Sequence, residues 1–183
     1  MQFKKIDIAD LCNHKLFYDP VPELSEDFGL DNICGLQKNL RWLEEEIVNW
    51  VEFRLHFGTY DNIQCNKQEI PVTARADKLH ILGFAYWGDT KEIFTIKYAD
   101  GTEELIYVPF IDWSHPFGGI ISEIEFADVQ VKTAKQTWAF GALEHPIFIH
   151  HSVSALNGSK EIEKILLPQN MFIHIFAVTL ENN

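Results

Sequence analysis

The alternation of apolar and polar residues along the chain predicts a protein built from β-strands. In Val51–Phe57 apolar and polar side chains alternate without a break, which places all the apolar ones on one face of a strand. Leu79–Ala85 is apolar almost throughout, which indicates a strand buried on both faces. The same pattern predicts further strands at 93–98, 104–110, 121–126, 129–132, 136–140, 146–154, 162–167 and 172–180.

Turn residues separate most of these segments. Asp100-Gly101 predicts a tight hairpin between 93–98 and 104–110, because glycine adopts positive φ without steric cost. Leu40–Val48 is different, since it has good helix formers and apolar residues at helical spacing, which predicts a short helix. Many short strands with at most one helix predict an all-β protein, an antiparallel β-sandwich of the jelly-roll type.

Length and composition fit one domain over residues 1–183. A chain of 183 residues with 46% hydrophobic residues has enough material for a sizeable core, and no linker or repeat divides it. Aromatic residues make up 13% of the chain, an excess that suits the pleated faces of sheets.

The charge restricts the partners. A formal charge of -12 repels phosphate backbones and anionic lipid, so nucleic acid and membrane surfaces are not expected partners, whereas neutral sugars and calcium are compatible with it. No segment has the length of a membrane span or the form of a signal peptide. Three cysteines without a C-x-x-C spacing predict free thiols, and we therefore expect a cytoplasmic protein.

Several segments resemble a known family. They are DLCNHKLFYD (10–19), VEFRLHF (51–57), IQCNKQEIPV (63–72), the long stretch 79–104 with its YADGTEE hairpin, the Asp112-Trp113 pair and KILLPQNMFIHIFAVTL (164–180). In this order they resemble the galactose-binding-like jelly-roll domains associated with bacterial glycoside hydrolases. The resemblance implies a β-sandwich in a carbohydrate-linked context, and it also implies a structural calcium ion in a loop. Members of that family are often secreted.

Two loops carry the residues most suited to binding a sugar. Trp87 and Asp89 fall between two predicted strands, where an exposed indole can stack on a sugar ring while a carboxylate accepts its hydroxyl hydrogen bonds. Asp112 and His115 follow the strand at 104–110 and could form a polar rim, although Asp112 could equally cap a turn. Trp113 between them is expected to pack, as the family resemblance implies.

Trp138 offers a second stacking platform, beside a loop that carries His145. Trp42 and Trp50 are expected to pack against the core. Acidic residues at 19, 23, 27 and 31 lack the spacing of a calcium loop, so the preferred interpretation is a solvated acidic segment and no cofactor is predicted.

Histidines in the last third of the chain raise the alternative of a transition-metal site. His150 and His151 point to opposite faces of one strand, and His145 lies about 20 Å from His151 at the rise of a strand. His151, on an apolar face, is expected to be a hydrogen-bonded core residue, while His150 could line a face open to ligand. A metal site would have to form across strands, for instance from His150 and His174.

We expect a non-catalytic domain that recognises a neutral sugar, because the sequence contains no nucleophile elbow, P-loop, dinucleotide motif or H-E-x-x-H motif. Two alternatives stay open. One is a small metal-assisted, sugar-modifying enzyme that uses cross-strand histidines, and the other is a homo-oligomeric scaffold module.

Overall fold

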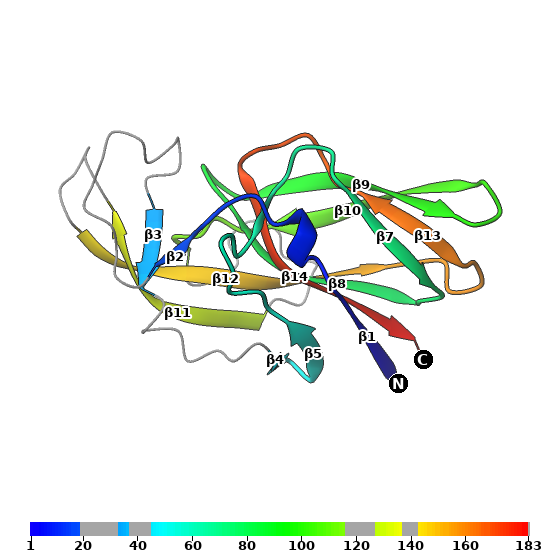
Figure 1. Ribbon diagram of the computed structural model, residues 1–183, viewed down its shortest axis with the longest axis horizontal. Coiled ribbons are helices and arrows are strands. Elements are labelled where there is room, and N and C mark those ends of the chain that lie inside the picture. The colour runs from blue at the N-terminus through cyan, green and yellow to red at the C-terminus, as the bar shows by residue number, and fades with distance from the viewer. Residues whose placement is uncertain (19–32, 37–44, 116–126, 137–142, 183) are drawn as a thin grey trace.

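The computed structural model describes residues 1–18, 33–36, 45–115, 127–136 and 143–182 (Figure 1). For Tyr18, 33–36, Glu46, 127–136 and 143–147 it describes the backbone alone. The strands are β1 (Gln2–Ile6), β2 (Phe17–Tyr18), β3 (Ile33–Leu36), β4 (Glu45–Val48), β5 (Val51–Arg54), β6 (Ile63–Gln64), β7 (Glu69–Ala74), β8 (Lys78–Ala85), β9 (Thr90–Tyr98), β10 (Glu103–Phe110), β11 (Ala127–Gln136), β12 (Leu143–Ala155), β13 (Ile162–Leu166) and β14 (Ile173–Asn182). Within these ranges the helical element is a 3-10 turn, η1 (Ala9–Leu11).

The strands form two stacked sheets and a separate ribbon. The large sheet has eight strands in the order β1-β14-β8-β12-β11-β3-β2, with β6 paired to β14, and the small sheet has four in the order β10-β9-β13-β7. In the described part of the chain, the strand pairs are antiparallel except for the short parallel pair β2–β3. The prediction of an all-β, antiparallel β-sandwich is therefore confirmed.

The main core lies between the two sheets. Leu79 and Ile81 of the large sheet face Phe94, Ile96 and Phe110 of the small sheet, and all five are at most 1% exposed. In Figure 1 the small sheet lies above β8 and β14. Alternation along β9 and β10 produces this core, because every second side chain of a strand points to the same face.

A second core covers the opposite face of the large sheet. The β4–β5 ribbon packs there, with Val51 and Phe53 buried against Leu82, Phe84 and other apolar residues. The Thr179 hydroxyl donates a hydrogen bond of 2.7 Å to the backbone carbonyl of Glu52, which fastens the ribbon to β14. The central strands are thus buried on both faces, as the continuous apolar run of Leu79–Ala85 predicts.

A β-bulge in β14 changes which side chains face the ribbon. The register against β8 shifts between Ile175 and Ala177, so that Phe176 and Ala177 both belong to the second core. After the bulge the odd-numbered positions face the ribbon, and Glu181 therefore shares a face with His80. Without the bulge, the strict alternation of a strand would place Glu181 on the face between the sheets.

The helix predicted at Leu40–Val48 is wrong where the structure describes it, because Glu45–Val48 is strand β4. Asn49 and Trp50 have φ values of 50° and 68°, and this two-residue turn returns the chain into β5. Pairing with β5 and packing on the large sheet override the helical propensity of the segment. Residues 40–44 lie outside the described residues.

The hairpin at Asp100-Gly101 is confirmed. Gly101 has a φ of 81°, and the Asp100 carboxylate accepts a hydrogen bond from the backbone N–H of Thr102. Most other predicted strands match observed ones within a few residues, while the prediction at 121–126 and most of that at 136–140 fall outside the described part. The strands β1, β2, β3, β6 and β7 were not predicted.

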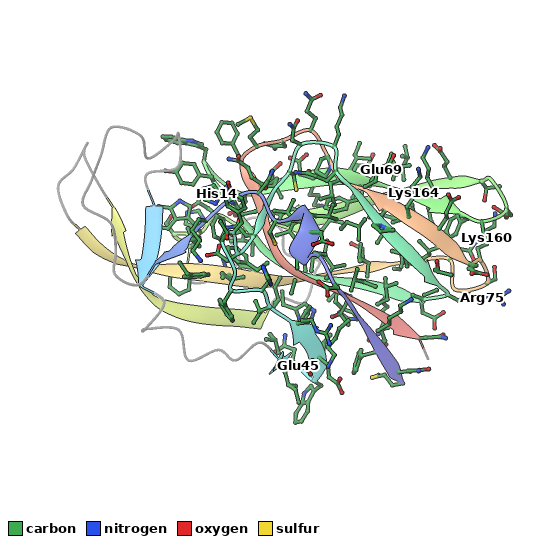
Figure 2. The ribbon with its side chains drawn as sticks, in the orientation of Figure 1. His14, Glu45, Glu69, Arg75, Lys160 and Lys164 are labelled. Carbon is green, nitrogen blue, oxygen red and sulfur yellow. The ribbon has the colours of Figure 1, made fainter. Side chains whose placement is uncertain are left out.

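Charged residues lie on the outer surface of the small sheet. Lys164 of β13 and Glu69 of β7 form a cross-strand ion pair at 2.8 Å (Figure 2). Among the described residues, no helix has the length and apolar character needed to cross a membrane.

We expect Gly83→Ala to destabilise the protein by roughly 1–3 kcal/mol, because overpacking a tight core forces the backbone to move. An added Cβ would lie 2.5 Å from the backbone oxygen of His174 and 3.0 Å from the Phe110 ring. Urea unfolding measures the change. Gly58→Ala is the matched control, since its Cβ would meet only the movable end of the His56 side chain. Equal effects of the two substitutions would contradict this account of the core.

Candidate functional site

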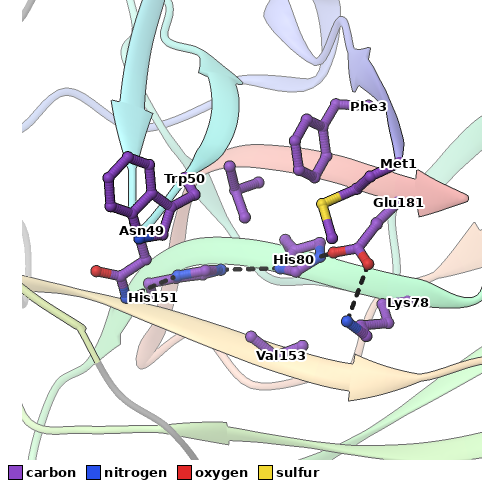
Figure 3. A pocket seen from close by; sticks show the side chains of 10 residues that line it. Met1, Phe3, Asn49, Trp50, Lys78, His80, His151, Val153 and Glu181 are labelled. Atoms are coloured by element: carbon purple, nitrogen blue, oxygen red, sulfur yellow. Dashed lines mark hydrogen bonds and ion pairs between the residues drawn. The ribbon is translucent and has the colours of Figure 1, made fainter. Parts of the chain in front are cut away.

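A cavity of about 450 Å³ lies where the β4–β5 ribbon crosses the large sheet. Its lining comes from the ribbon, from the start of the chain and from β8, β12 and β14, and comprises Met1, Phe3, Asn49, Trp50, Val51, Lys78, His80, His151, Val153 and Glu181. Figure 3 shows Trp50 and Asn49 at one end, Phe3 and Met1 at the other, and a row of polar side chains along the floor. Apolar walls with a few convergent polar groups are typical of small-molecule sites.

The polar row is a continuous hydrogen-bonded chain. Nε2 of His151 lies 2.9 Å from Nδ1 of His80, and Nε2 of His80 lies 3.0 Å from a carboxylate oxygen of Glu181. The other carboxylate oxygen of Glu181 accepts from Nζ of Lys78 at 2.9 Å. At the far end, Nδ2 of Asn49 approaches Nδ1 of His151 at 3.4 Å.

Burial dominates the electrostatics of this row of polar side chains. His80 and His151 are 3% and 2% exposed, and desolvation lowers the pKa of both. For His151 the pKa falls to about 4, with a smaller contribution from the neighbouring His80. Hydrogen bonds from Lys78 and His80 outweigh burial at Glu181 and hold its carboxyl pKa below the usual value. At neutral pH both imidazoles are therefore neutral and the carboxylate is ionised.

The turn above the cavity holds a tryptophan in an unusual conformation. A two-residue hairpin turn with positive φ at both positions favours Asn followed by Gly, and here Trp50 occupies the glycine position. A bulky residue in the left-handed region costs roughly 1–2 kcal/mol. Trp50 is nevertheless 89% exposed, so contacts within the described part of the chain do little to offset this cost. The expectation that Trp50 packs is wrong, because the turn projects its indole away from the core.

Four of the predicted site residues meet at a second place, the rim formed by 86–90 and 111–115. Nδ1 of His115 lies 3.2 Å from a carboxylate oxygen of Asp89, and the same oxygen accepts from the backbone N–H of Asp112. Trp87 stands beside them, 77% exposed and at a φ of 79°. The structure thus brings together Trp87, Asp89, Asp112 and His115.

Asp112 holds this rim together. One of its carboxylate oxygens accepts from the backbone N–H of Gly88 at 2.6 Å, and the other accepts from both the N–H and the hydroxyl of Ser114. Its side chain is buried, which agrees with the interpretation as a cap. Trp113 packs as expected, because its ring stacks on Tyr86 and it is 8% exposed.

The structure does not place the other predicted site residues with the four that meet at the rim. Trp138 and Trp42 lie outside the described residues, as does the acidic segment at 19–31 that bears on calcium. Of His145 the structure describes only the backbone, in β12 opposite Ala134.

Of the remaining histidine predictions, the one for His151 is confirmed and the one for His150 is wrong. His151 is buried and hydrogen-bonded, as expected. His150 does not line an open face, because β10 covers it: the neighbouring Ser152 and Ser154 donate to the backbone carbonyls of Pro109 and Tyr107. Opposite residues of paired strands share a face, so His150 follows Gly83 while His174 follows Phe84 to the other side of β8.

A metal ion bound jointly by His150 and His174 is therefore ruled out by geometry. Among the described side chains, no group of three His, Cys, Asp or Glu is placed to hold a metal ion. Cys12 and Cys65 are free thiols, and burial raises the pKa of both.

Sequence reasoning missed the cavity because its residues come from five separate segments. His80 lies within an apolar strand and Glu181 near the end of another, and neither position stands out in a linear pattern. One signal was available: a histidine within a run buried on both faces requires a hydrogen-bond partner.

The protein should lose stability on mild acidification. The unfolded chain binds protons at His151 near pH 6.5, whereas the folded chain does so only near 4, so stability falls as pH drops through this window. From pH 7 to 5 the His151 contribution amounts to about 2 kcal/mol. Urea unfolding at both pH values should show a smaller decrease in His151→Gln. An equal decrease in both proteins would contradict the assignment.

Asp112→Asn should destabilise the protein by about 1–3 kcal/mol, because either orientation of the amide points its NH₂ group at a donor. Those donors are Gly88 N–H on one side and the two donors of Ser114 on the other. Thermal unfolding of this variant is compared with that of Asp10→Asn, which changes an exposed carboxylate. If the two variants unfold alike, the capping role of Asp112 is disproved.

Comparison with known proteins places this architecture in a family. No curated protein matches the chain. The model of the AziU2-like beta-sandwich domain matches residues 44–183, which are 140 of the 183 residues. The match runs from the ribbon to the end of β14, and thus includes the polar chain and the rim. The chain therefore belongs to the family of AziU2-like β-sandwich domains.

Proposed function

We propose that this protein is a non-catalytic binding domain for a small, neutral, hydroxylated ligand of the carbohydrate class, held in the cavity beneath the Asn49–Trp50 turn. The observation that carries the proposal is the combination of an exposed indole with a buried polar floor. An indole stacks on the C–H face of a sugar ring, while imidazole and carboxylate groups hydrogen-bond to its hydroxyls. The resemblance to galactose-binding-like domains that we infer from the sequence motifs points to the same ligand class, while the matching family model describes only a β-sandwich domain.

Charge supports a neutral ligand. The net charge of -12 disfavours anions, and within the cavity the positive charge of Lys78 already faces the negative charge of Glu181. An ionic ligand would have to displace this pair, whereas a neutral one would not. By the same reasoning nucleic acid is not proposed as a partner.

The backbone of Trp50 also favours a binding role. The hairpin turn imposes the left-handed conformation, yet the sequence places a tryptophan where a glycine would avoid the strain, and strained residues of this kind cluster at functional sites. Trp87 at the rim shows the same combination of positive φ and high exposure. The rim is therefore a second location for the same ligand class, with Trp87 as platform and His115 as polar neighbour.

The alternative of a metal-assisted, sugar-modifying enzyme has less support, because the imidazoles of His80 and His151 already hydrogen-bond to each other. An oligomeric scaffold remains the outcome that a negative binding result would favour.

Titration of a panel of neutral mono- and oligosaccharides by calorimetry tests the proposal. We expect Trp50→Gly to weaken binding about tenfold or more, a change of about 1.4 kcal/mol. Glycine suits the φ of 68° at this position, so the variant should fold at least as well as the wild type. Loss of binding in Trp50→Gly then reflects the missing indole rather than misfolding.

Trp87→Gly is the matched control, since it removes an exposed indole at a φ of 79°. If this substitution abolishes binding and Trp50→Gly does not, the ligand lies at the rim. Failure of the wild type to bind any glycan, together with a dimer in light scattering, would replace the proposal with the scaffold alternative.

A further inference from the structure

The hydrogen bonds of the polar row under the Asn49–Trp50 turn all run in one direction, from His151 through His80 to Glu181. An ionised carboxylate only accepts hydrogen bonds, so Nε2 of His80, at 3.0 Å from Glu181, must carry a proton and donate it. In a neutral imidazole the other nitrogen then has a free lone pair. Nδ1 of His80 is therefore an acceptor, and at 2.9 Å it requires a proton on Nε2 of His151.

The same step repeats at His151. With its proton on Nε2, neutral His151 has a lone pair on Nδ1, at the end of the chain that faces the Asn49–Trp50 turn. Its contact there is Nδ2 of Asn49 at 3.4 Å, a donor at a long distance from an exposed side chain. The carboxylate of Glu181 thus determines the tautomer of a histidine that it does not touch.

The surroundings keep the imidazoles of His80 and His151 neutral. Lys78 places a positive charge on the far side of Glu181, which opposes a second positive charge on His80. The rings of Phe53 and Phe3 lie edge-on to His151 and His80, at centroid distances of 5.3 and 6.3 Å, and offer no charge. Burial is the largest cause, because it lowers the pKa of both imidazoles.

We infer that Glu181 and His80 are positioning residues that present Nδ1 of His151 as a hydrogen-bond acceptor, and that the cavity selects ligands that donate a hydrogen bond at this atom. This inference rests on the proposed function for the ligand class and narrows it. A hydroxyl group of a sugar replaces the Asn49 amide as the donor. A ligand with the same ring whose hydroxyls are all methylated leaves the lone pair without a donor.

The tautomers are measurable without a ligand. Two-bond ¹H–¹⁵N spectra of protein labelled with ¹⁵N-histidine distinguish a protonated ring nitrogen from one with a lone pair. At pH 7 we expect His80 and His151 both to carry their proton on Nε2, with the signals assigned from His80→Gln and His151→Gln. A proton on Nδ1 of His151 in the wild type would overturn the inference.

Glu181→Gln tests the role of the carboxylate. The lysine ammonium of Lys78 donates only, so it claims the single oxygen of the glutamine amide, and the NH₂ group then faces His80. His80 must accept at Nε2, and the whole chain reverses, leaving Nδ1 of His151 protonated. A merely structural role for Glu181 would not move this signal. His56→Gln, outside the cavity, should leave both tautomers unchanged.

Binding provides the second readout. A methyl pyranoside with free hydroxyls should bind the wild type about tenfold or more tightly than its fully O-methylated derivative, because a site built to pair with a donor rejects an analogue without one. Glu181→Gln should lose this preference. If neither probe binds but the tautomers are as expected, the proposed ligand class is wrong, while the inferred control of the His151 tautomer by Glu181 and His80 holds. Equal binding of both probes would refute donor selection at His151.

Discussion

The large sheet of this protein has to be covered on both faces, and the rest of the structure depends on that requirement. β8 and β14 carry apolar side chains on both sides, so neither face tolerates water. The small sheet covers one face and the β4–β5 ribbon covers the other. The ribbon has only two short strands, and the cavity lies at the place where its cover ends.

The polar chain in the cavity is a consequence of this partial cover. His80 sits in a strand whose neighbours are fully buried, and its ring nitrogens have to be satisfied within the protein. Glu181 and His151 satisfy them, and Lys78 completes the chain where it reaches solvent. A partly open site with apolar walls and an ordered row of polar groups therefore arises, although no single residue in it is unusual in the sequence.

The strands were predictable where one face alone is buried or where the run is continuous. The alternation of Val51–Phe57 and the apolar run of Leu79–Ala85 both lie in observed strands, at least in part, and Asp100-Gly101 forms the expected hairpin. Short strands such as β2 and β6 left no pattern long enough to detect. The segment before Asn49 was misjudged because its helical spacing is a local property, whereas its strand pairing comes from contacts with β5 and the large sheet.

By itself the sequence determined the fold class, the hairpin, the buried position of His151 and the loop positions of Trp87 and Asp112. Each of these follows from periodicity or turn chemistry, which act over a few residues. Only the tertiary structure decided that Trp50 is exposed, that His150 and His174 face opposite ways and that Glu181 reaches His80. For Glu181 the physical reason is the bulge in β14, which shifts the alternation by one residue. For Trp50 it is the positive-φ turn between β4 and β5, and for the two histidines it is the pairing of β12 and β14 with β8, and no local pattern records any of these.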